Sequence, residues 1–302
     1  MNRVLIMMST YNGGEIIERQ VKSIINQKDV DISLLIRDDG SEDNTRKILK
    51  TIVNKYKNIN VEYGNNLGWK RSFLELVYSS SLEYDYYGFS DQDDIWLNDK
   101  IISLINLMED DVYSGPKLAH CNSLSVDMNL KVRKEQEDRI SSPPGWKQAI
   151  ATEYFQGCGM LWNHDAMKLI RKYRPKNVNL AHDYWVGLVC YLFGQVYFCS
   201  ERKFYHIRYN TNGSEDGSVK KGRLNRFKKF FLGKDIYMNP AEDLLEGFTG
   251  LLSDEQVYFL KMVKDYKYNT NHKYKIFIDK SFARPSICAS IFFKMTILTN
   301  NY

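Results

Sequence analysis

The sequence lacks the features that define several large classes of protein. Its five cysteines are odd in number and widely spaced, without a CxxC pair, which argues against a disulfide framework or a zinc site and favours a reducing cytosol. No run of about 18 apolar residues occurs, so no membrane-spanning helix is expected. The nearest candidate, Trp185–Cys199, is interrupted by glycine and glutamine and is interpreted as a buried helix followed by a strand. No signal peptide is visible, because the apolar run Val4–Met8 enters a polar turn at once.

The fingerprints of two common nucleotide-binding folds are also missing. There is no GxGxxG and no Walker A pattern, which argues against NAD and against ATP in a P-loop. The net charge of +5 is too small to indicate nucleic-acid binding by itself. Positive charge does gather in Lys220–Lys234, where Leu224, Phe227 and Phe231 share one helical face. Two interpretations of this segment stay open, a solvated helix face and a surface that docks on an anionic inner membrane leaflet.

The sequence does contain a regular alternation of strands and helices over roughly its first 120 residues. Short apolar runs predict strands at Val4–Met8, Ile32–Ile36, Asn60–Tyr63, Tyr84–Phe89 and Leu118–Cys121. Because helical patterns link these strands, we expect an α/β fold with a mainly parallel, Rossmann-like sheet and right-handed crossovers. Ligands bind such sheets outside the carboxyl ends of the strands, so the residues after each strand are the first candidates for a site.

Polar clusters follow the first four predicted strands. They are Ser9–Asn12, Asp38–Ser41, Asn65–Gly68 and Ser90–Asp94. Since the carboxyl ends of parallel strands meet at one edge of a sheet, these clusters together predict a binding site.

The last of these clusters is strongly acidic, because Asp91, Asp93 and Asp94 fall within four positions. Carboxylates this close repel one another, and burying them is costly unless a cation is present. Mn²⁺ or Mg²⁺ resolves this conflict, since such ions take carboxylates and complete their shell with water and diphosphate oxygens. The alternative is a solvated acidic turn that caps the next helix, although aromatic residues flank the cluster on both sides.

The second cluster has two interpretations. Gly40 permits a tight turn, and Ser41 or Asp43 can cap the helix that follows. A carboxylate at a strand end can instead accept a hydrogen bond from the imide N–H of a nucleobase. The order of the two acidic clusters along the chain favours the second interpretation.

Three motifs in this order resemble glycosyltransferase family 2. They are Ser9–Gly13, Arg37–Asp43 and Ser90–Trp96. The form Asp-Gln-Asp-Asp-Ile-Trp is most similar to the rhamnosyltransferase-like members of bacterial polysaccharide pathways. The resemblance covers roughly residues 3–210 and implies a GT-A fold with a helical C-terminal region.

The resemblance also implies roles on the donor side. Asp91 and Asp93 would form the DxD element, in which Asp93 ligates the metal and Asp91 touches ribose or the metal. Residues after the first three strands would bind the nucleotide sugar: Thr10, Tyr11, Asn12, Asp39, Asn66, Gly68 and Arg71.

On the acceptor side, Gly157 and Cys158 resemble the Gly-Cys segment that walls the acceptor, and Trp185 belongs to the same region. The segment that begins at His182 resembles the one that supplies the catalytic base, which makes Asp183 the candidate base. Two structural alternatives stand beside these roles: Asp183 as a helix N-cap, and His182 as a packing histidine, which is the preferred role for that residue. Cys158 is interpreted as a packing residue, because a single displacement needs no nucleophilic side chain.

The chain departs from the family pattern in Tyr205–Asn210. Family members carry a Tyr-Arg-Gln-His segment whose histidine can approach the metal, but here His206 is displaced by two positions and Arg208 aligns instead. The third metal ligand is therefore left open, and Arg208 is a candidate for binding the diphosphate directly. No Gln-x-x-Arg-Trp motif is present, which argues against a processive synthase.

The function that follows is an inverting transfer of a sugar from a nucleotide donor to a hydroxyl of a growing, lipid-linked bacterial surface polysaccharide. The resemblance favours dTDP-rhamnose as the donor, with a UDP-hexose as the alternative. Two other classes stay open. A glycoside hydrolase could use Asp93 and Asp183 as a carboxylate pair, although Asp39 would then be unexplained. A non-catalytic nucleotide-sugar-binding protein would be expected to lose an acidic motif.

The expected organisation is a GT-A domain over residues 1–215, divided near residue 125 into a nucleotide-sugar half and an acceptor half, and a helical region over residues 216–302. At the junction of these two parts, Asn212–Ser218 is expected to form a mobile loop. Ser253 and Gln256 form a capping-box pattern for a helix at Asp254–Lys264. The expected location is the cytoplasm, peripheral on the inner face of the plasma membrane.

Overall fold

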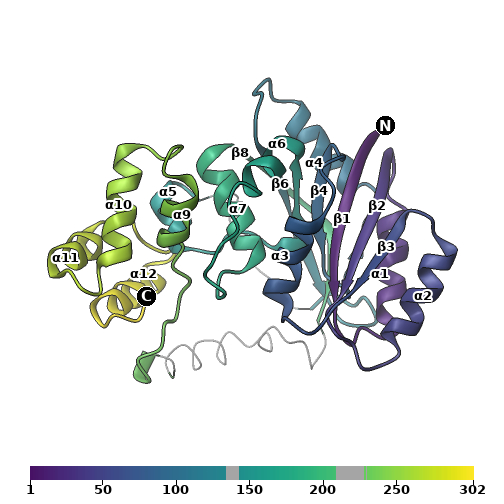
Figure 1. The fold of residues 1–302 in the computed structure, drawn as a ribbon, viewed down its shortest axis with the longest axis horizontal. Coiled ribbons are helices and arrows are strands. Elements are labelled where there is room, and N and C mark those ends of the chain that lie inside the picture. The colour runs from purple at the N-terminus through teal and green to yellow at the C-terminus, as the bar shows by residue number, and fades with distance from the viewer. Residues whose placement is uncertain (134–142, 209–227, 229) are drawn as a thin grey trace. The chain divides into compact units, whose positions relative to one another are not determined.

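The computed structural model describes residues 1–133, 143–208, 228 and 230–302, and the chain forms two compact units. The sheet unit comprises Met1–Ser142, Phe155–Lys172 and Ala181–Arg208. The helical unit comprises Pro143–Tyr154, Tyr173–Leu180 and Tyr209–Tyr302. Two short segments from the middle of the chain therefore belong with the C-terminal helices (Figure 1).

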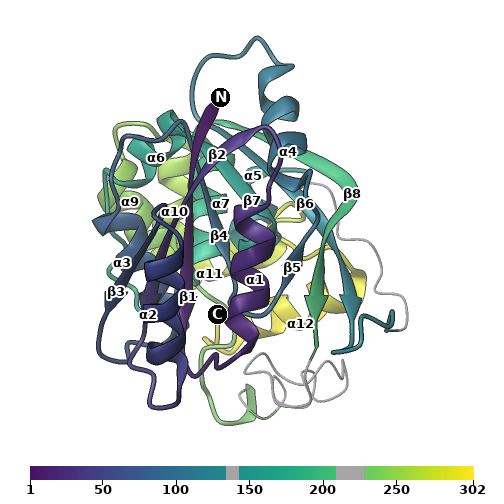
Figure 2. The ribbon, with the colours of Figure 1, turned by 90° about the vertical axis from the view of Figure 1, so that its right-hand side faces the viewer.

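The sheet unit is built on one eight-stranded sheet, in the order β3-β2-β1-β4-β7-β6-β8-β5 (Figure 2). Its strands are β1 (Asn2–Thr10), β2 (Val30–Asp38), β3 (Ile59–Tyr63), β4 (Tyr86–Ser90), β5 (Ile95–Trp96), β6 (Lys117–Val126), β7 (Met160–Asn163) and β8 (Gln195–Ile207). The neighbours β3, β2, β1 and β4 are parallel, as predicted.

The second half of the mainly parallel sheet adds antiparallel pairings that the sequence pattern did not indicate. β7 runs antiparallel between β4 and β6, β5 runs antiparallel along β8, and only β6 and β8 are parallel there. Neither β5 nor β7 exceeds four residues, which is too short for apolar periodicity to identify it. The sheet is therefore mixed, and its first four strands carry the parallel α/β pattern.

Helices cover both faces of this sheet (Figures 1 and 2). One face carries α1 (Ile16–Ile25), α2 (Thr45–Lys55) and α4 (Lys100–Glu109), whose apolar residues share one core cluster with alternate residues of β1. The other carries α3 (Trp69–Ser79), α6 (His164–Ile170) and α7 (His182–Phe193). β1 is a continuous apolar run because it is buried on both faces, with Val4 on one face and Met7 on the other both 0% exposed.

The helical unit consists of α5 (Trp146–Ala151), α9 (Ala241–Phe248), α10 (Asp254–Asp265), α11 (Thr270–Ile278) and α12 (Ile287–Leu298). The predicted capping box at the start of α10 is confirmed: Gln256 N donates to Ser253 Oγ over 3.2 Å, and Ser253 N donates to Gln256 Oε1 over 2.8 Å. The core is aromatic, with the Phe282 ring centroid 5.1 Å from those of both Phe259 and Phe293.

The predicted loop Asn212–Ser218 and most of the basic segment Lys220–Lys234 lie outside the described residues. In the part of the chain that is described, no helix has both the length and the apolar character needed to cross a bilayer.

Candidate functional site

The carboxyl ends of the first four strands lie side by side. In the parallel register Thr10 pairs with Asp38, Asp38 with Tyr63, and Met8 with Ser90. The polar residues that follow these strands therefore share one edge of the sheet, as the sequence predicts. The polar residues at this edge form two groups, a loop cluster around Asp39 and an acidic cluster around Asp94.

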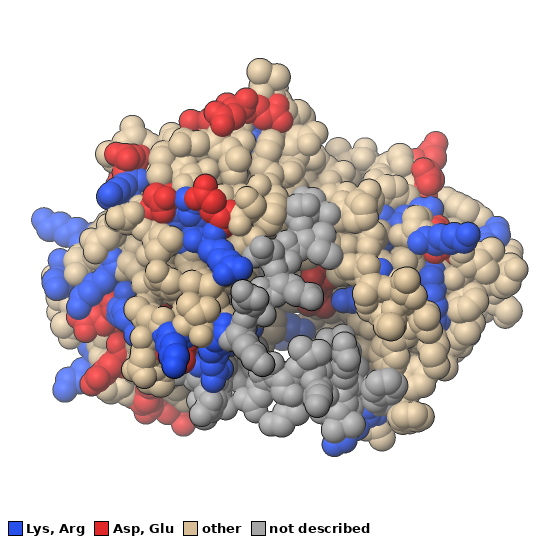
Figure 3. All heavy atoms as spheres, turned by 180° about the vertical axis from the view of Figure 1, so that it is seen from behind, with Lys and Arg blue, Asp and Glu red and all other residues tan. Residues whose placement is uncertain are grey.

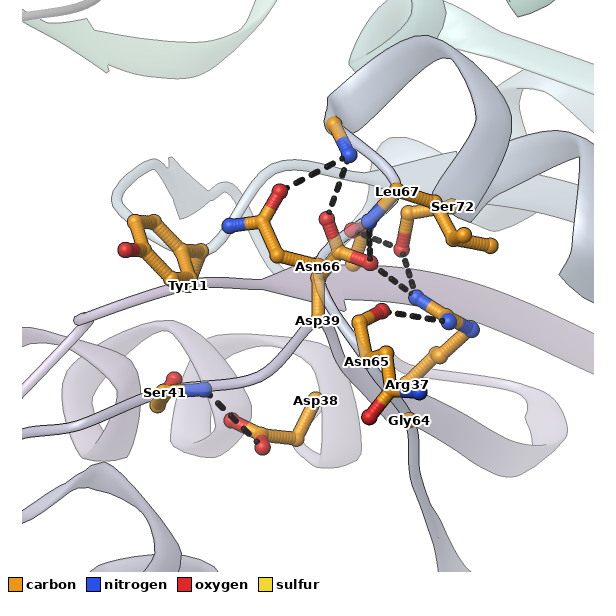
Figure 4. Close-up of polar contacts among 12 residues, drawn as sticks. Tyr11, Arg37, Asp38, Asp39, Ser41, Gly64, Asn65, Asn66, Leu67 and Ser72 are labelled. Atoms are coloured by element: carbon orange, nitrogen blue, oxygen red, sulfur yellow. Dashed lines mark hydrogen bonds and ion pairs between the residues drawn. The ribbon is translucent and has the colours of Figure 1, made fainter.

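The Asp39 carboxylate holds the loop that follows β3 (Figure 4). Leu67 N donates to Asp39 Oδ1 and Gly68 N donates to Oδ2, both over 2.9 Å, and the Arg37 guanidinium forms an ion pair with Oδ1. Asp39 is only 2% exposed, and charge-assisted hydrogen bonds of this kind are among the strongest in proteins. Three of about four acceptor positions on the carboxylate are thus used, which leaves Oδ2 with capacity for one further donor.

Arg37 links this cluster to the neighbouring elements. Its Nη1 donates to Ser72 Oγ over 3.0 Å and its Nη2 to Asn65 O over 3.1 Å. A Cβ at Gly64 would collide with the guanidinium, so glycine is required at that position. Arg37 is buried, and it therefore fixes both the Asp39 carboxylate and the loop that Asp39 holds.

Asp38, the other carboxylate of the pair, has a structural role. Its Oδ2 accepts from Arg46 Nε over 2.7 Å and from Ser41 N over 3.2 Å, and the residue is 0% exposed. Asp43 Oδ1 accepts from Thr45 N over 3.0 Å at the start of α2. The N-cap of α2 is Asn44, so neither Ser41 nor Asp43 is the capping residue, although Asp43 accepts from the first N–H of the helix. Asp39, by contrast, points to the loop.

Gln92, between the two aspartates of the DxD element, ties the acidic loop to the end of β1. Its Oε1 accepts from Thr10 Oγ1 over 2.6 Å and from Tyr11 N over 3.0 Å. Asn12 N donates to Ser41 Oγ over 2.9 Å, which joins the same loop to the turn after β2. The loops after β1, β2 and β4 are therefore connected by hydrogen bonds.

The carboxylates of the acidic cluster are close enough for the charge of one to affect the pKa of another. Asp94 is fully buried, and Asp91 and Asp93 are half-buried. Burial together with repulsion from neighbouring carboxylates raises the pKa of Asp91 to about 7 and the pKa of Asp93 to about 6. The cations of His206 and Arg208 counter the rise at Asp93. Carboxylates in this state gain most from a bound cation, so the donor set fits a divalent metal.

His206 lies against this cluster despite its displacement in the sequence. Its Nδ1 is 2.8 Å from Asp94 Oδ1, and although burial lowers the pKa of His206, the hydrogen bond and charge of Asp94 raise it overall. The ligand atoms of Asp94, Cys158 and His206 all lie within 4.8 Å of one another. His206 and Arg208 are two positions apart, so an extended backbone presents both side chains on one side.

Lys100 is a buried cation beneath this cluster. Its Nζ donates to Cys158 O over 2.6 Å and lies 3.1 Å from the centroid of the Trp96 ring. Burial lowers the pKa of Lys100 to about 8, against the raising influence of nearby thiols and carboxylates. Burial, together with Asp94 and Asp91, raises the pKa of the Cys158 thiol well above its ordinary value. Cys158 therefore stays a protonated packing residue.

The candidate base Asp183 lies beside the Gly157 segment. A Cβ built on Gly157 would be 3.4 Å from Asp183 Cβ and 2.8 Å from His182 Nε2. Asp183 is half-buried in the first turn of α7, where Ala181 is the N-cap, so the N-cap alternative for Asp183 is wrong. The His182 ring stacks on Phe73 at 4.0 Å, and burial lowers the pKa of His182 to about 4, as a neutral packing histidine requires.

The other predicted site residues fall into two groups. Tyr11, Asn66 and Arg71 are exposed near the Asp39 loop and are open to a ligand. Trp185 is 0% exposed in α7, so its ring belongs to the core and does not reach an acceptor surface.

The sequence did not predict a role at the site for four residues that the structure places there: Arg37, Gln92, Lys100 and His206. Arg37 and Gln92 do lie inside the recognised motifs, where Arg37 directly precedes an acidic pair and Gln92 lies between two aspartates. Lys100 resembles any helical lysine in the sequence, and only its burial identifies it.

The surface charge of the sheet unit is mixed in sign on the face seen from behind. Lys and Arg side chains are interspersed with Asp and Glu over the face of this unit seen from behind (Figure 3). That face is unlike the basic stripe of a nucleic-acid-binding domain.

The model of glycosyl transferase family 2 matches residues 5–172. The dTDP-rhamnosyl transferase RfbG of Shigella flexneri is 36% identical over 189 residues, which are 58% of this chain and 60% of that protein. The chain spans less than two thirds of the length of the curated relatives it matches.

Two solved structures share the fold. S. aureus TarS 1-349 in complex with UDP-GlcNAc has a TM-score of 0.59 and 14% identity, with 93% of this chain and 78% of that chain covered. The mannosyltransferase PcManGT from Pyrobaculum calidifontis, in complex with GDP-Man and Mn²⁺, has a TM-score of 0.53 and 12% identity, with 100% of this chain and 88% of that chain covered. The predicted α/β fold of the GT-A type is thereby confirmed.

Proposed function

Because the chain belongs to glycosyl transferase family 2, we propose that it transfers a sugar from a nucleoside diphosphate to an acceptor hydroxyl with inversion. The observation that carries this proposal is the meeting of two sites at one sheet edge: the Asp39 loop and the acidic cluster Asp91–Asp94. A glycoside hydrolase has no use for the first of these, and a binding scaffold has no use for a candidate base at Asp183.

The Asp39 loop is the proposed nucleoside pocket. Asp39 holds Leu67 and Gly68 in place and keeps one acceptor position on Oδ2, which suits an imide N–H of uracil or thymine. Tyr11 is 43% exposed beside this loop and offers a ring face for the base. Thr10 and Asn12 act indirectly in this proposal, since their side chains fix the loops that carry Tyr11.

A divalent cation is proposed to bind at Asp91 and Asp93, since burial and the negative charge of the neighbouring Asp94 raise the pKa of both carboxylates and a cation would relieve this. The ion would neutralise negative charge on the leaving diphosphate. Asp94 would hold His206 through Nδ1, which leaves Nε2 for another partner, an arrangement that commonly orients metal-binding imidazoles. Arg208, close to Asp93, is the proposed direct contact to the diphosphate.

Asp183 is the proposed base. It lies against Gly157 on the side of the site where the family pattern places the acceptor, and it takes the proton of the attacking hydroxyl. The attack opposite the leaving group inverts the anomeric centre without a covalent intermediate. Cys158, with its raised thiol pKa, has no chemical step in this scheme.

The proposed donor is dTDP-rhamnose, which follows the activity named for the Shigella flexneri relative, and a UDP-hexose is the alternative. The proposed acceptor is a lipid-linked bacterial glycan, with the chain working from the cytoplasm at the inner face of the plasma membrane. The basic segment Lys220–Lys234 fits this location by its charge.

The test is a thermal-shift titration with UDP, dTDP, GDP and NAD, each with and without Mn²⁺. Ligand that binds only the folded chain stabilises it by about 2.7 kcal/mol at a hundredfold excess over Kd. We expect a shift with one pyrimidine diphosphate that needs Mn²⁺ and disappears in Asp93→Ala. The matched control is Asp31→Ala, an exposed carboxylate at the opposite end of β2, which should keep the shift. No shift with any nucleoside diphosphate would overturn the proposal.

A further inference from the structure

α12 is apolar on the side that faces away from its own core. Phe293, Thr296 and Ile297 are buried in the helical unit. The opposite side carries a stripe of apolar residues at helical spacing, with exposed fractions of 81%, 58%, 45% and 49%: Ile287, Ile291, Met295 and Leu298. A helix in contact with water normally places polar residues on that side, so this face is suited to a partner less polar than water.

Two further exposed apolar residues, Phe231 and Leu232, belong to a segment that contacts α12. The ring centroids of Phe230 and Phe292 are 5.6 Å apart, and Asn301 Nδ2 donates to Phe230 O over 3.1 Å. These contacts fix the short segment that continues into Phe231 and Leu232, which are 81% and 69% exposed. The apolar surface thus extends beyond one helix.

The two chain segments that form this surface contain cations and no carboxylate, and Asp235, which follows the second of them, is paired with Lys267 over 2.7 Å. No Asp or Glu occurs from Ser281 to Tyr302, and none occurs from Gly217 to Lys234, where the sequence holds seven Lys and Arg residues. Among the described residues of that stretch, Lys228 and Lys234 are exposed on either side of Phe231 and Leu232. Apolar side chains bordered by cations without carboxylates are complementary to an anionic lipid surface.

The geometry points to an interfacial anchor: we infer that the exposed face of α12 and the segment Phe230–Lys234 dock on an anionic lipid bilayer. A second copy of the chain fits less well, because a symmetric pairing of this surface would bring the exposed Lys228 and Lys234 of both copies together. The inference rests on the proposed function only for its purpose, which is to hold the enzyme where a lipid-linked acceptor lies.

Cys288 gives a direct probe of this docking. It is the exposed cysteine, in the first turn of α12, and the other four cysteines are buried. The full-length chain is labelled at Cys288 with an NBD fluorophore and mixed with vesicles of phosphatidylcholine alone or of phosphatidylcholine with phosphatidylglycerol. We expect a blue shift and a rise in NBD emission with the anionic vesicles only, weakened by added salt.

Variants separate the apolar and the cationic contributions. Ile291→Asp should reduce the partition coefficient by about tenfold or more, and Lys228→Gln or Lys234→Gln by about fivefold each. The control is Val112→Asp, which changes a 100% exposed apolar residue of the sheet unit and should bind vesicles like the parent. Nucleotide-induced thermal shifts measured on the same variants should stay unchanged, which separates failure of docking from failure of the proposed transferase site.

Two results would overturn the inference. One is NBD emission that does not respond to anionic vesicles. The other is self-association of the unlabelled chain in sedimentation velocity that Ile291→Asp abolishes, since the stripe would then be an interface between copies.

Discussion

Gly157 lies so close to His182 that a Cβ at position 157 would be 2.8 Å from the imidazole Nε2. The His182 ring cannot give way easily, because it is stacked on Phe73 at 4.0 Å and meets Phe89 edge-on at 4.6 Å. The neighbouring residue, Asp183, is the proposed base, so the spacing between Gly157 and α7 sets the position of that carboxylate.

Gly157→Ala should therefore lower turnover by about tenfold or more, since a displacement near one ångström at a reacting group has large effects. The overpacking should also cost about 1–3 kcal/mol of stability. Turnover is measured by donor consumption, and stability is measured by urea unfolding. Gly250→Ala is the control, because a Cβ there meets nothing within 4 Å. If the two alanine variants behave alike, the contact with His182 does not position Asp183.

Asp39→Asn tests the nucleoside loop. The amide keeps the shape of the side chain but removes the charge that faces Arg37, and its NH₂ group opposes the N–H of Leu67 or Gly68. Leaving these buried groups unmatched should cost about 2–4 kcal/mol of unfolding free energy. We expect the affinity of Asp39→Asn for pyrimidine nucleotides, measured by calorimetric titration, to fall as well. Asp31→Asn, at an exposed position near the start of β2, the strand that Asp39 follows, should change neither quantity. Wild-type affinity in Asp39→Asn would remove this loop from the nucleoside pocket.

The first half of the sheet was predictable because each of its strands is an apolar or alternating segment that a helical pattern follows. The polar clusters after these strands were predictable for the same reason, since parallel strands bring their carboxyl ends together. β7 was not, because a four-residue strand that inserts antiparallel between β4 and β6 leaves no periodic signal and depends on contacts distant in sequence.

Within the site, the sequence could not assign the two adjacent carboxylates to their roles. Asp38 and Asp39 follow one another, and only the backbone path sends the first to Arg46 and the second to Leu67 and Gly68. The position of His206 was equally hidden. The pairing of β6 with β8 shifts register between Cys121 and Ser123, so counting residues along β8 does not reveal which side chain reaches Asp94.

Cys158→Ala distinguishes packing from chemistry at the base of the acidic cluster. Burial and the nearby carboxylates raise the pKa of the thiol, so it should not exist as a thiolate near neutral pH. We expect turnover to stay within about threefold, with a stability cost of about 1–2 kcal/mol for the small cavity. Loss of a covalent nucleophile would instead lower turnover by about a thousandfold or more. Mass spectrometry after iodoacetamide treatment should find Cys288 modified and Cys158 intact.

The buried His182 should make stability depend on pH. Burial lowers its pKa in the folded chain to about 4, from an ordinary value of 6.5. As pH falls below 6.5, the unfolded chain takes up a proton that the folded chain does not, so stability is lost until about pH 4. The free energy of unfolding lost through this pKa shift is on the order of 3 kcal/mol. His182→Leu cannot take the proton, so its unfolding free energy should fall less over this window than that of the parent chain. Urea unfolding of both full-length proteins from pH 8 to pH 4 measures this difference. The contributions of Asp91 and Asp93 cancel in the difference, because both proteins contain these carboxylates. Parallel pH profiles would mean that His182 can be protonated within the fold, and the aromatic cage around it would not keep it neutral.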